Sequence, residues 1–423
     1  MHEISQRAPE AADTDASSVT RKRVLFIAEA VTLAHVARVH ALAQMLDREV
    51  FEICIACDPR YNALIGNHPF ESRAITTISR ERFTAALEKG RPLYDVPTLT
   101  AYVEEDGSII DAFRPDVVIG DFRLSLSISA RLARVPYVNI TNAGWSPYAR
   151  LKFTIPDIAL ARLLGVPVAQ ALFDIARPFA FALHAMPLNR LRKRYGLRSL
   201  PLDLRYIYTD GDFTLYADIP ELFTVDSLPS NHAFLGAVLW SPAMPLPSWW
   251  NALPYDSPIV YVTLGSSGQI ALLPTVLEIL GELPVTVIAA TAGRIALDRI
   301  PPNAHVADYL PGSLAAAVAS VVICNGGSPT CYQAFSAGVP VIGIAGNLDQ
   351  YLNMRAVENN NAGVLIRPQE LRFKLAASID AALTSDTQSR SAQRLGMAIE
   401  NHQPSSVLNK TLSRAMGIES IRE

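Results

Sequence analysis

This chain of 423 residues has few cysteines and a small net charge. Four cysteines are too few for a disulfide framework, so we expect a reducing, cytoplasmic location. The 37 basic residues against 40 acidic ones leave a net charge of −3, which offers no attraction for nucleic acid. Cys54 and Cys57 form a CxxC pair, but on a predicted strand their side chains point to opposite faces. We therefore expect no metal or disulfide there, and no other His, Cys and Asp set has metal-ligand spacing.

Long uninterrupted apolar runs are missing as well. The closest candidate, Val166–Pro187, contains Asp174, Arg177, His184 and three prolines, so we predict no membrane-spanning helix. Residues 1–20 are polar, which predicts a disordered tail and no export signal. Just beyond this segment lies a cluster of basic residues, Arg190, Arg192, Lys193 and Arg194. We interpret the cluster as a solvated helix end, with a membrane-surface role as the alternative.

Half of the residues are hydrophobic, and short apolar runs alternate with segments of helical spacing in both halves of the chain. Arg23–Glu29 and Pro258–Leu264 are typical of buried parallel strands. The alternation predicts an α/β protein of two Rossmann-like, doubly wound parallel-sheet domains that face each other across a cleft. We expect an N-terminal domain at 21–239, a proline-rich linker at 240–257, a C-terminal domain at 258–400, and a helix within 401–423 that packs back toward the N-terminal domain.

The richest local signal is the segment CNGGSPTCYQAFSAGVPVIGIAGNLDQ, residues 324–350. A buried strand ends at Cys324, and Asn325-Gly326-Gly327 follows as an open turn in which glycines let an anion approach the backbone. Ser328 is expected to cap a helix whose first residue is Pro329. Thr330 adds a hydroxyl donor. Bare N–H groups at such a helix start are typical of a phosphate site.

This stretch resembles the donor signature of the UDP-glycosyltransferase-like family, the GT-B nucleotide-sugar glycosyltransferases of bacterial macrolide and natural-product type. Gly327, Thr330, Gly338-Val339-Pro340 and Asp349-Gln350 fall at matching spacings. By this resemblance, Thr330 and the nearby amides would hold the diphosphate, and Asp349 and Gln350 would bond the donor sugar.

The resemblance assigns further donor contacts. Tyr309 in VADYLP would stack on the nucleobase, and Ser266 and Ser267 would approach the phosphates. Two positions depart from the family pattern. Asn325 stands where the family has a histidine, and Gln333 where it has a ribose-binding glutamate.

The loop after the first strand is expected to supply the catalytic base. Residues 32–43 resemble the family's G-H-x-x-P turn, so His35 matches its catalytic histidine, and Asp121 falls at the partnering carboxylate. A neutral imidazole can take a proton from an acceptor hydroxyl, and a carboxylate on its far nitrogen fixes the tautomer. His40, inside the following helix, is the rival base.

The resulting interpretation is an inverting, metal-independent glycosyltransferase with a UDP- or dTDP-sugar as co-substrate and no other cofactor. The apolar segment 153–188 predicts a hydrophobic, hydroxylated acceptor, with packing of the N-terminal core as the alternative. Two other functions compete with this one: a degenerate homologue that only binds, and a nucleotide-sugar epimerase on the same fold. The sequence leaves the oligomeric state open.

Overall fold

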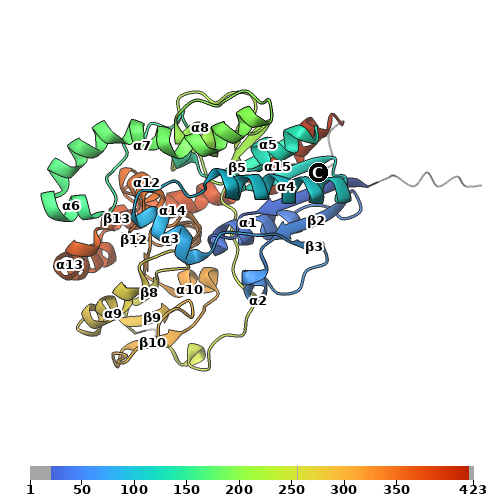
Figure 1. The fold of residues 1–423 in the computed structure, drawn as a ribbon. Helices are drawn as coiled ribbons and strands as arrows, with labels where there is room; N and C mark the ends of the chain where they lie inside the picture. The colour runs from blue at the N-terminus through green and yellow to red at the C-terminus, as the bar shows by residue number, and fades with distance from the viewer. Residues whose placement is uncertain (1–20, 255, 419–423) are drawn as a thin grey trace, which may run out of the picture.

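In the computed structural model, which describes residues 21–254 and 256–418, the chain forms two parallel β-sheets flanked by helices (Figure 1). The tail predicted at residues 1–20 lies outside the described residues. The strands of the N-terminal sheet are β1 (Lys22–Ala28), β2 (Phe51–Cys57), β3 (Glu71–Ala74), β4 (Val117–Asp121), β5 (Tyr137–Thr141), β6 (Phe213–Tyr216) and β7 (His232–Phe234). Those of the C-terminal sheet are β8 (Ile259–Thr263), β9 (Thr286–Ala290), β10 (Ala304–Ala307), β11 (Val321–Cys324), β12 (Val341–Ile344) and β13 (Gly363–Ile366).

Both sheets have the doubly wound strand order that the alternating pattern predicted. The N-terminal sheet runs β3-β2-β1-β4-β5-β6-β7, and the C-terminal sheet runs β10-β9-β8-β11-β12-β13. The order reverses direction between β1 and β4 in the first sheet and between β8 and β11 in the second. Ligands of open α/β sheets bind at such switch points, beyond the carboxyl ends of the strands.

Helices join the strands in each domain. The N-terminal helices are α1 (Leu33–Gln44), α2 (Asn62–Ile65), α3 (Arg80–Glu88), α4 (Val96–Phe113), α5 (Leu126–Leu132), α6 (Ala159–Leu164), α7 (Val166–Arg194) and α8 (Leu204–Tyr208). Those after the linker are α9 (Leu273–Gly281), α10 (Gly312–Val318), α11 (Ser328–Ser336), α12 (Leu348–Asn359), α13 (Leu371–Thr384), α14 (Asp386–Asn401) and α15 (Pro404–Met416).

Strand β1 shows why the apolar runs form central strands. Val24 and Phe26 enter one core, Leu25 and Ile27 enter the core on the other face of the sheet, and all four are fully buried. A strand covered on both faces must be apolar at every position. The same alternation places the CxxC side chains on opposite faces of β2, as predicted, because Cys54 and Cys57 belong to opposite cores.

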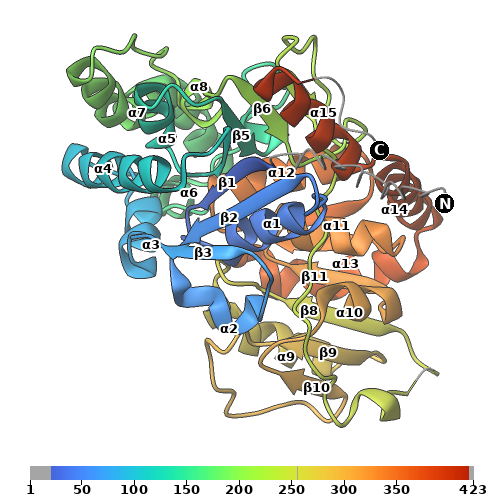
Figure 2. The same cartoon turned by 90° about the vertical axis from the view of Figure 1, so that its right-hand side faces the viewer.

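The chain crosses between the domains twice. After β7 it enters the second domain through the linker, where Trp250 and Leu253 are buried in an apolar core formed by residues of both domains. Helix α15 then returns to the first domain, where Leu408 and Leu412 join the core formed around β1 and α1. Figure 2 shows α15, in red, against the N-terminal sheet.

Helix α7 corrects one sequence expectation. The charges and prolines of Val166–Pro187 led us to predict no membrane-spanning helix there, but α7 is one helix of 29 residues that continues through Pro178 and Pro187. Within the described residues, it is the one helix long and apolar enough, by length and composition, to cross a membrane. One side of it packs into the N-terminal domain, where Phe181, Ala185 and Leu188 are buried.

Candidate active site

The predicted base and its carboxylate meet at the switch point of the N-terminal sheet. His35 lies in the first turn of α1, directly after β1, rather than in the loop where we expected it. Asp121 is the last residue of β4. His35 Nδ1 and Asp121 Oδ1 are 2.7 Å apart, and the Asp121 side chain is 1% exposed. No other described residue is hydrogen-bonded to the His35 ring, which is 18% exposed, so Nε2 is free to contact an acceptor.

Phe122 stacks on one face of the imidazole ring. Its ring stacks on that of His35 with centroids 4.9 Å apart and planes 8° apart. Phe122 follows Asp121 with a φ of 59°, a left-handed conformation that is uncommon for a residue with a large side chain. Strain of this kind persists only where the surrounding structure enforces it, and it often marks functional sites. The His35 ring is therefore fixed by a hydrogen bond on its edge and an aromatic ring on its face.

Arg38, which stands at the proline position of the family's G-H-x-x-P turn, is a further member of this site. Its Nε lies 3.2 Å from Asp121 Oδ2, so the two carboxylate oxygens face His35 and Arg38 respectively. Arg38 is 6% exposed, and its positive charge offsets the cost of burying the carboxylate in its ionised form. The spacing from His35, one helical turn, was the available signal.

His40, the rival base, has a different environment. It is 2% exposed and its ring lies edge-on to that of His68, with centroids 4.6 Å apart. Burial, with the neighbouring His68, lowers the pKa of His40 to about 4. It is thus a neutral core residue at physiological pH.

The candidate phosphate loop lies at the switch point of the C-terminal sheet, after β11. Gly326 has a φ of 76°, and a Cβ there would meet Met354 Cγ at 2.5 Å, so only glycine fits. Asn325 is 6% exposed; its Oδ1 accepts from Gly327 N at 3.1 Å and its Nδ2 donates to Ser267 Oγ at 3.2 Å. The Asn325 side chain therefore bonds within its own loop and links that loop to the loop after β8.

Helix α11 starts one residue earlier than expected. Gly327 is the N-cap and has no side chain to bond the first turn, whereas Ser328, our expected cap, is the first helical residue. Pro329 and Thr330 follow in that turn, and Thr330 is half-buried. A helix start whose amides lack a side-chain cap keeps them for an anion.

Other predicted donor residues are engaged within the protein. Tyr309 donates to Ala292 O at 2.8 Å, and Gln333 Nε2 donates to Trp240 O at 2.7 Å, which fastens the linker. Gln350 is 2% exposed and forms a capping box with Asn347 at the start of α12. A donor contact by Gln333 or Gln350 would have to exchange these bonds, so their binding roles stay predictions.

Two contacts cross between the domains beside the site, and both involve residues predicted from the sequence. Ser266 Oγ accepts from Leu33 N at 3.4 Å, at the start of α1. Asp349 Oδ1 accepts from Trp145 Nε1 at 2.7 Å. Trp145 was missed, because nothing local in the sequence pairs residues 204 positions apart.

A third crossing, also missed, leads from the dyad to the start of α11. Arg38 Nη2 donates to Asn142 Oδ1 at 3.4 Å, and Asn142 Nδ2 donates to Ser328 Oγ at 3.2 Å. Asn142 also donates to Asp218, which accepts from Tyr332 Oη at 2.8 Å. Burial raises the pKa of the Asp218 carboxyl, and these donors satisfy its oxygens. Polar contacts thus connect the candidate base with the candidate phosphate helix.

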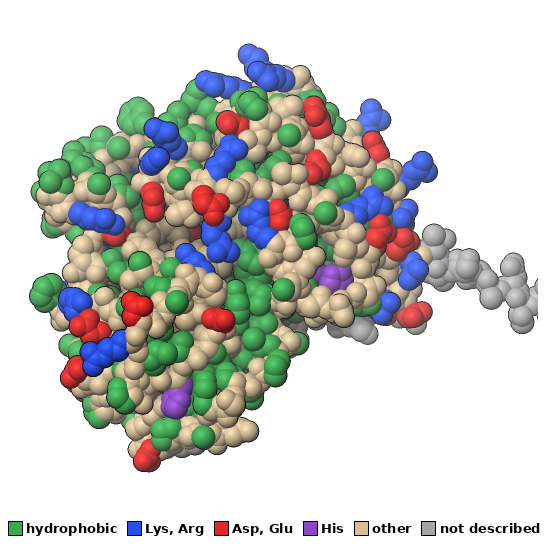
Figure 3. Space-filling model, turned by 60° about the horizontal axis from the view of Figure 1, so that its bottom comes forward, with side chains coloured by type: hydrophobic (Ala, Val, Ile, Leu, Met, Phe, Trp, Pro, Cys, Tyr) green, Lys and Arg blue, Asp and Glu red, His purple; other side chains and the backbone are tan. Residues whose placement is uncertain are grey.

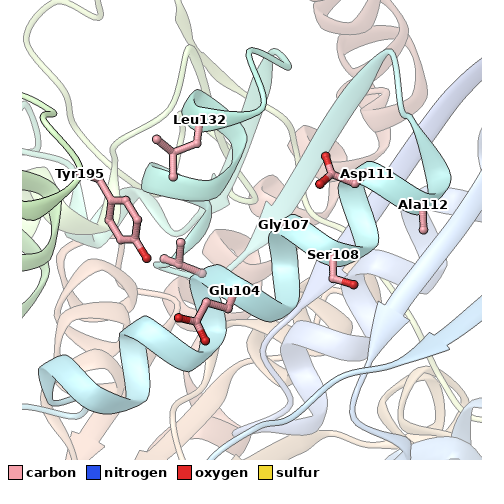
Figure 4. Close-up of a pocket in the computed structure, with 8 residues that line it drawn as sticks. Glu104, Gly107, Ser108, Asp111, Ala112, Leu132 and Tyr195 are labelled. Atoms are coloured by element: carbon pink, nitrogen blue, oxygen red, sulfur yellow. The ribbon is translucent and has the colours of Figure 1, made fainter.

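The surface hollow shown in Figure 4 is separate from this site. It has a volume of about 710 Å³ and lies along α4, between Leu132 of α5 and Tyr195 after α7. None of the predicted site residues lines it. Among the described residues, no group of three His, Cys, Asp or Glu side chains could hold a metal ion.

Comparisons with known proteins place this geometry in a family. Residues 274–412 match the model of the C-terminal domain of erythromycin biosynthesis protein CIII-like proteins. The chain is 56% identical over 372 residues to a PGL/p-HBAD biosynthesis rhamnosyltransferase of Mycobacterium bovis, covering 88% of this chain and 83% of the relative. It is 52% identical over 379 residues to a PGL/p-HBAD biosynthesis glycosyltransferase of Mycobacterium tuberculosis, covering 89% of each. An inactive PGL/p-HBAD biosynthesis glycosyltransferase of Mycobacterium bovis is 50% identical over 262 residues, which cover 62% of this chain and 72% of that protein.

Solved structures agree on the fold. A spinosyn rhamnosyltransferase superposes with a TM-score of 0.68 at 20% identity, covering 92% of this chain and all of that one. A calicheamicin glycosyltransferase gives a TM-score of 0.66 at 17% identity, covering 94% and 99%. The fold is that of the GT-B glycosyltransferases, and the relatives identify the chain as a glycosyltransferase. The chain belongs to the UDP-glycosyltransferase-like family of natural-product type, and within it is similar to the PGL/p-HBAD biosynthesis glycosyltransferases.

Proposed function

We propose that the protein is an inverting, metal-independent glycosyltransferase that moves a sugar from a dTDP- or UDP-sugar to a hydroxyl of a hydrophobic acceptor. The observation that carries the proposal is the 2.7 Å contact between His35 and Asp121, at the switch point of one sheet, with the candidate phosphate loop at the switch point of the other.

The reaction follows from the positions of these groups. His35 Nε2 accepts the proton of the acceptor hydroxyl, and Asp121 stabilises the imidazolium that forms. The acceptor oxygen forms a bond to the anomeric carbon while the bond from that carbon to the diphosphate breaks on the opposite face, so the configuration inverts. The amides at the start of α11 stabilise the negative charge on the leaving nucleoside diphosphate.

Two comparisons support the donor. A relative is named a rhamnosyltransferase, and a structural neighbour was solved in complex with thymidine diphosphate. We therefore favour a deoxyhexose carried by dTDP, with UDP as the alternative carrier. Titration calorimetry with dTDP, UDP and their sugars tests this choice. The proposal expects dTDP to bind more tightly than UDP, and equal or reversed affinities would exclude this preference.

The acceptor proposal rests on a row of aromatic rings that starts at His35. Phe122 contacts Tyr208 at 5.3 Å between centroids, and Tyr208 contacts Trp145 at 4.9 Å. Phe122 and Trp145 are half-buried, as expected for rings that border a ligand. Such a wall suits an aromatic or other apolar acceptor. The segment 153–188, which we predicted to line the acceptor site, does not form one lining surface, because Phe153 and Phe181 are buried in the core behind Trp145.

Product analysis with phenolic, steroidal and sugar acceptors tests this part. Transfer to the phenolic or steroidal acceptors is expected, and transfer to free sugars alone would contradict it.

One relative is named inactive, so a binding protein without turnover is the second candidate. Tight donor binding without transfer to any acceptor of the panel would favour that candidate.

A further inference from the structure

The outer face of α6 and α7 is a continuous apolar surface without a partner in the described residues. Five exposed side chains of α7 follow one another at spacings of three or four residues, so they form one stripe along the helix. They are Val168, Leu172, Ile175, Phe179 and Leu183, between 44% and 76% exposed. Leu163 and Leu164 of α6 extend the surface at its N-terminal end, where Leu163 is 82% exposed. Figure 3 shows hydrophobic side chains gathered at the left edge of the molecule, where α6 and α7 lie in Figure 1.

The stripe is not a requirement of the fold. The opposite side of α7, with Phe181, Ala185 and Leu188, already packs against the N-terminal domain. Of the most apolar 18-residue window of α7, only 11% is buried. Soluble proteins rarely expose apolar patches of this extent unless the patch binds something. The stripe runs over 16 residues, from Val168 to Leu183, or about 22 Å at 1.5 Å per step, long enough for an extended contact.

The same helix face changes from apolar to basic toward its C-terminal end. Arg190 lies seven residues, about two turns, beyond Leu183, and Lys193 and Arg194 follow in the last turn. All three are exposed, and none forms an ion pair with a described residue. Arg192, on the inner side, bonds Asp210 and Ser127 and belongs to the fold. Asp174, the one acidic residue between Leu163 and Arg194, lies about 200° around the helix from Leu172, away from the stripe.

We propose that this face docks the protein on an anionic lipid membrane, with α7 lying in the plane of the interface. An apolar stripe enters the boundary of the acyl chains, and basic side chains on the same face meet the lipid phosphates. The unpaired cations favour a lipid surface over an apolar protein partner, since burying them without counter-charges would be costly. Helix α7 does not span the bilayer, because its inner side is occupied by the core. The proposal is independent of the catalytic assignment, since docking is measured without turnover.

Vesicle sedimentation tests the proposal. The full chain is mixed with vesicles of phosphatidylcholine and phosphatidylglycerol in equal parts, or of phosphatidylcholine alone, and the bound fraction is measured. Preferential binding to the anionic vesicles is expected, with weakening at high salt. The variant Ile175→Ser/Phe179→Ser should lose affinity by about tenfold or more, because it removes two of the most exposed side chains of the stripe.

The matched control is Phe373→Ser. Phe373 is 87% exposed on α13, outside the stripe, so its loss should leave vesicle binding unchanged. A second variant, Arg190→Gln/Lys193→Gln/Arg194→Gln, should reduce binding to the anionic vesicles only.

Transfer to a soluble acceptor should be equal in the wild type and the serine variants, which separates docking from catalysis. Wild-type protein that stays in the supernatant, or a double variant that binds as well as the wild type, would overturn the proposal. A dimer in sedimentation velocity that the double variant abolishes would identify a second copy as the occupant and likewise overturn it.

Discussion

At the scale of single residues, the site combines a predictable pair with a third member that only the structure reveals. The pairing of His35 with Asp121 could be predicted from the family resemblance and from the strands predicted before each residue, and the structure places the two side chains 2.7 Å apart. The ion pair of Arg38 with Asp121 could not, because it depends on how α1 is rotated against β4. The bonds of Trp145 to Asp349 and of Asn142 to Ser328 depend in the same way on how the two domains meet.

Arg38 is a positioning residue, and its replacement tests that role. In Arg38→Met the carboxylate of Asp121 loses the partner of its second oxygen, so its alignment with His35 loosens. We expect kcat to fall by about tenfold or more while the donor Kd changes little, and Arg38→Lys to restore part of the rate. The contradicting result is an Arg38→Met enzyme whose kcat is unchanged, or one in which donor affinity and kcat fall together.

His40 predicts a dependence of stability on pH. Its pKa of about 4 in the folded protein is below the value near 6.5 of an exposed histidine. Between these two pH values, His40 is therefore protonated in the unfolded chain but neutral in the folded protein. Stability is therefore complete above about pH 6.5 and decreases as the pH falls toward 4, by at most about 3 kcal/mol from this residue. Urea unfolding at pH 7 and pH 5 should show this loss, and His40→Leu should reduce it. If wild type and His40→Leu lose the same free energy, His40 is not the cause.

At the scale of elements, the strands were the most predictable part and helix α7 the least. Strands such as β1 and β11 are covered on both faces, so their sequences are apolar throughout and easy to recognise. Charges and prolines in α7 suggested that no helix of membrane-spanning length would form, but Pro178 lies on the exposed side, where water can bond the carbonyl that the ring leaves unpaired. Whether a proline breaks a helix thus depends on surroundings that the sequence does not contain.

The loop between β11 and α11 gives a prediction at this scale. Gly326→Ala would combine a left-handed φ with a contact of 2.5 Å to Met354, so the loop must shift. We expect donor affinity to fall by about tenfold or more, because the loop presents the amides of α11 to the phosphates. Gly107→Ala, a helical position on α4 with open space around its Cβ, is the control. Calorimetry with dTDP and UDP measures both, and wild-type affinity in Gly326→Ala would remove the loop from the donor site.

At the scale of the whole molecule, the two domains meet through a shared apolar core and through polar contacts beside the candidate site. Leu33 with Ser266, Asn142 with Ser328 and Trp145 with Asp349 each join an N-terminal element to a C-terminal loop or helix. The sequence predicted the two sheets and the cleft between them, since each domain repeats the same alternation of strands and helices. It could not predict the pairs across the interface, since these are set by the relative placement of two independently recognisable units.

The most direct test of the proposed function is the single-turnover rate of His35→Ala with saturating dTDP-sugar and a phenolic acceptor. The variant should transfer the sugar more slowly by a factor on the order of 10²–10⁴, with donor affinity within about twofold of the wild type. Asp121→Asn should also be slower, whereas His402→Ala, at the end of α14, should transfer at the wild-type rate. A His35→Ala enzyme that keeps most of the wild-type rate would contradict the assignment of the base.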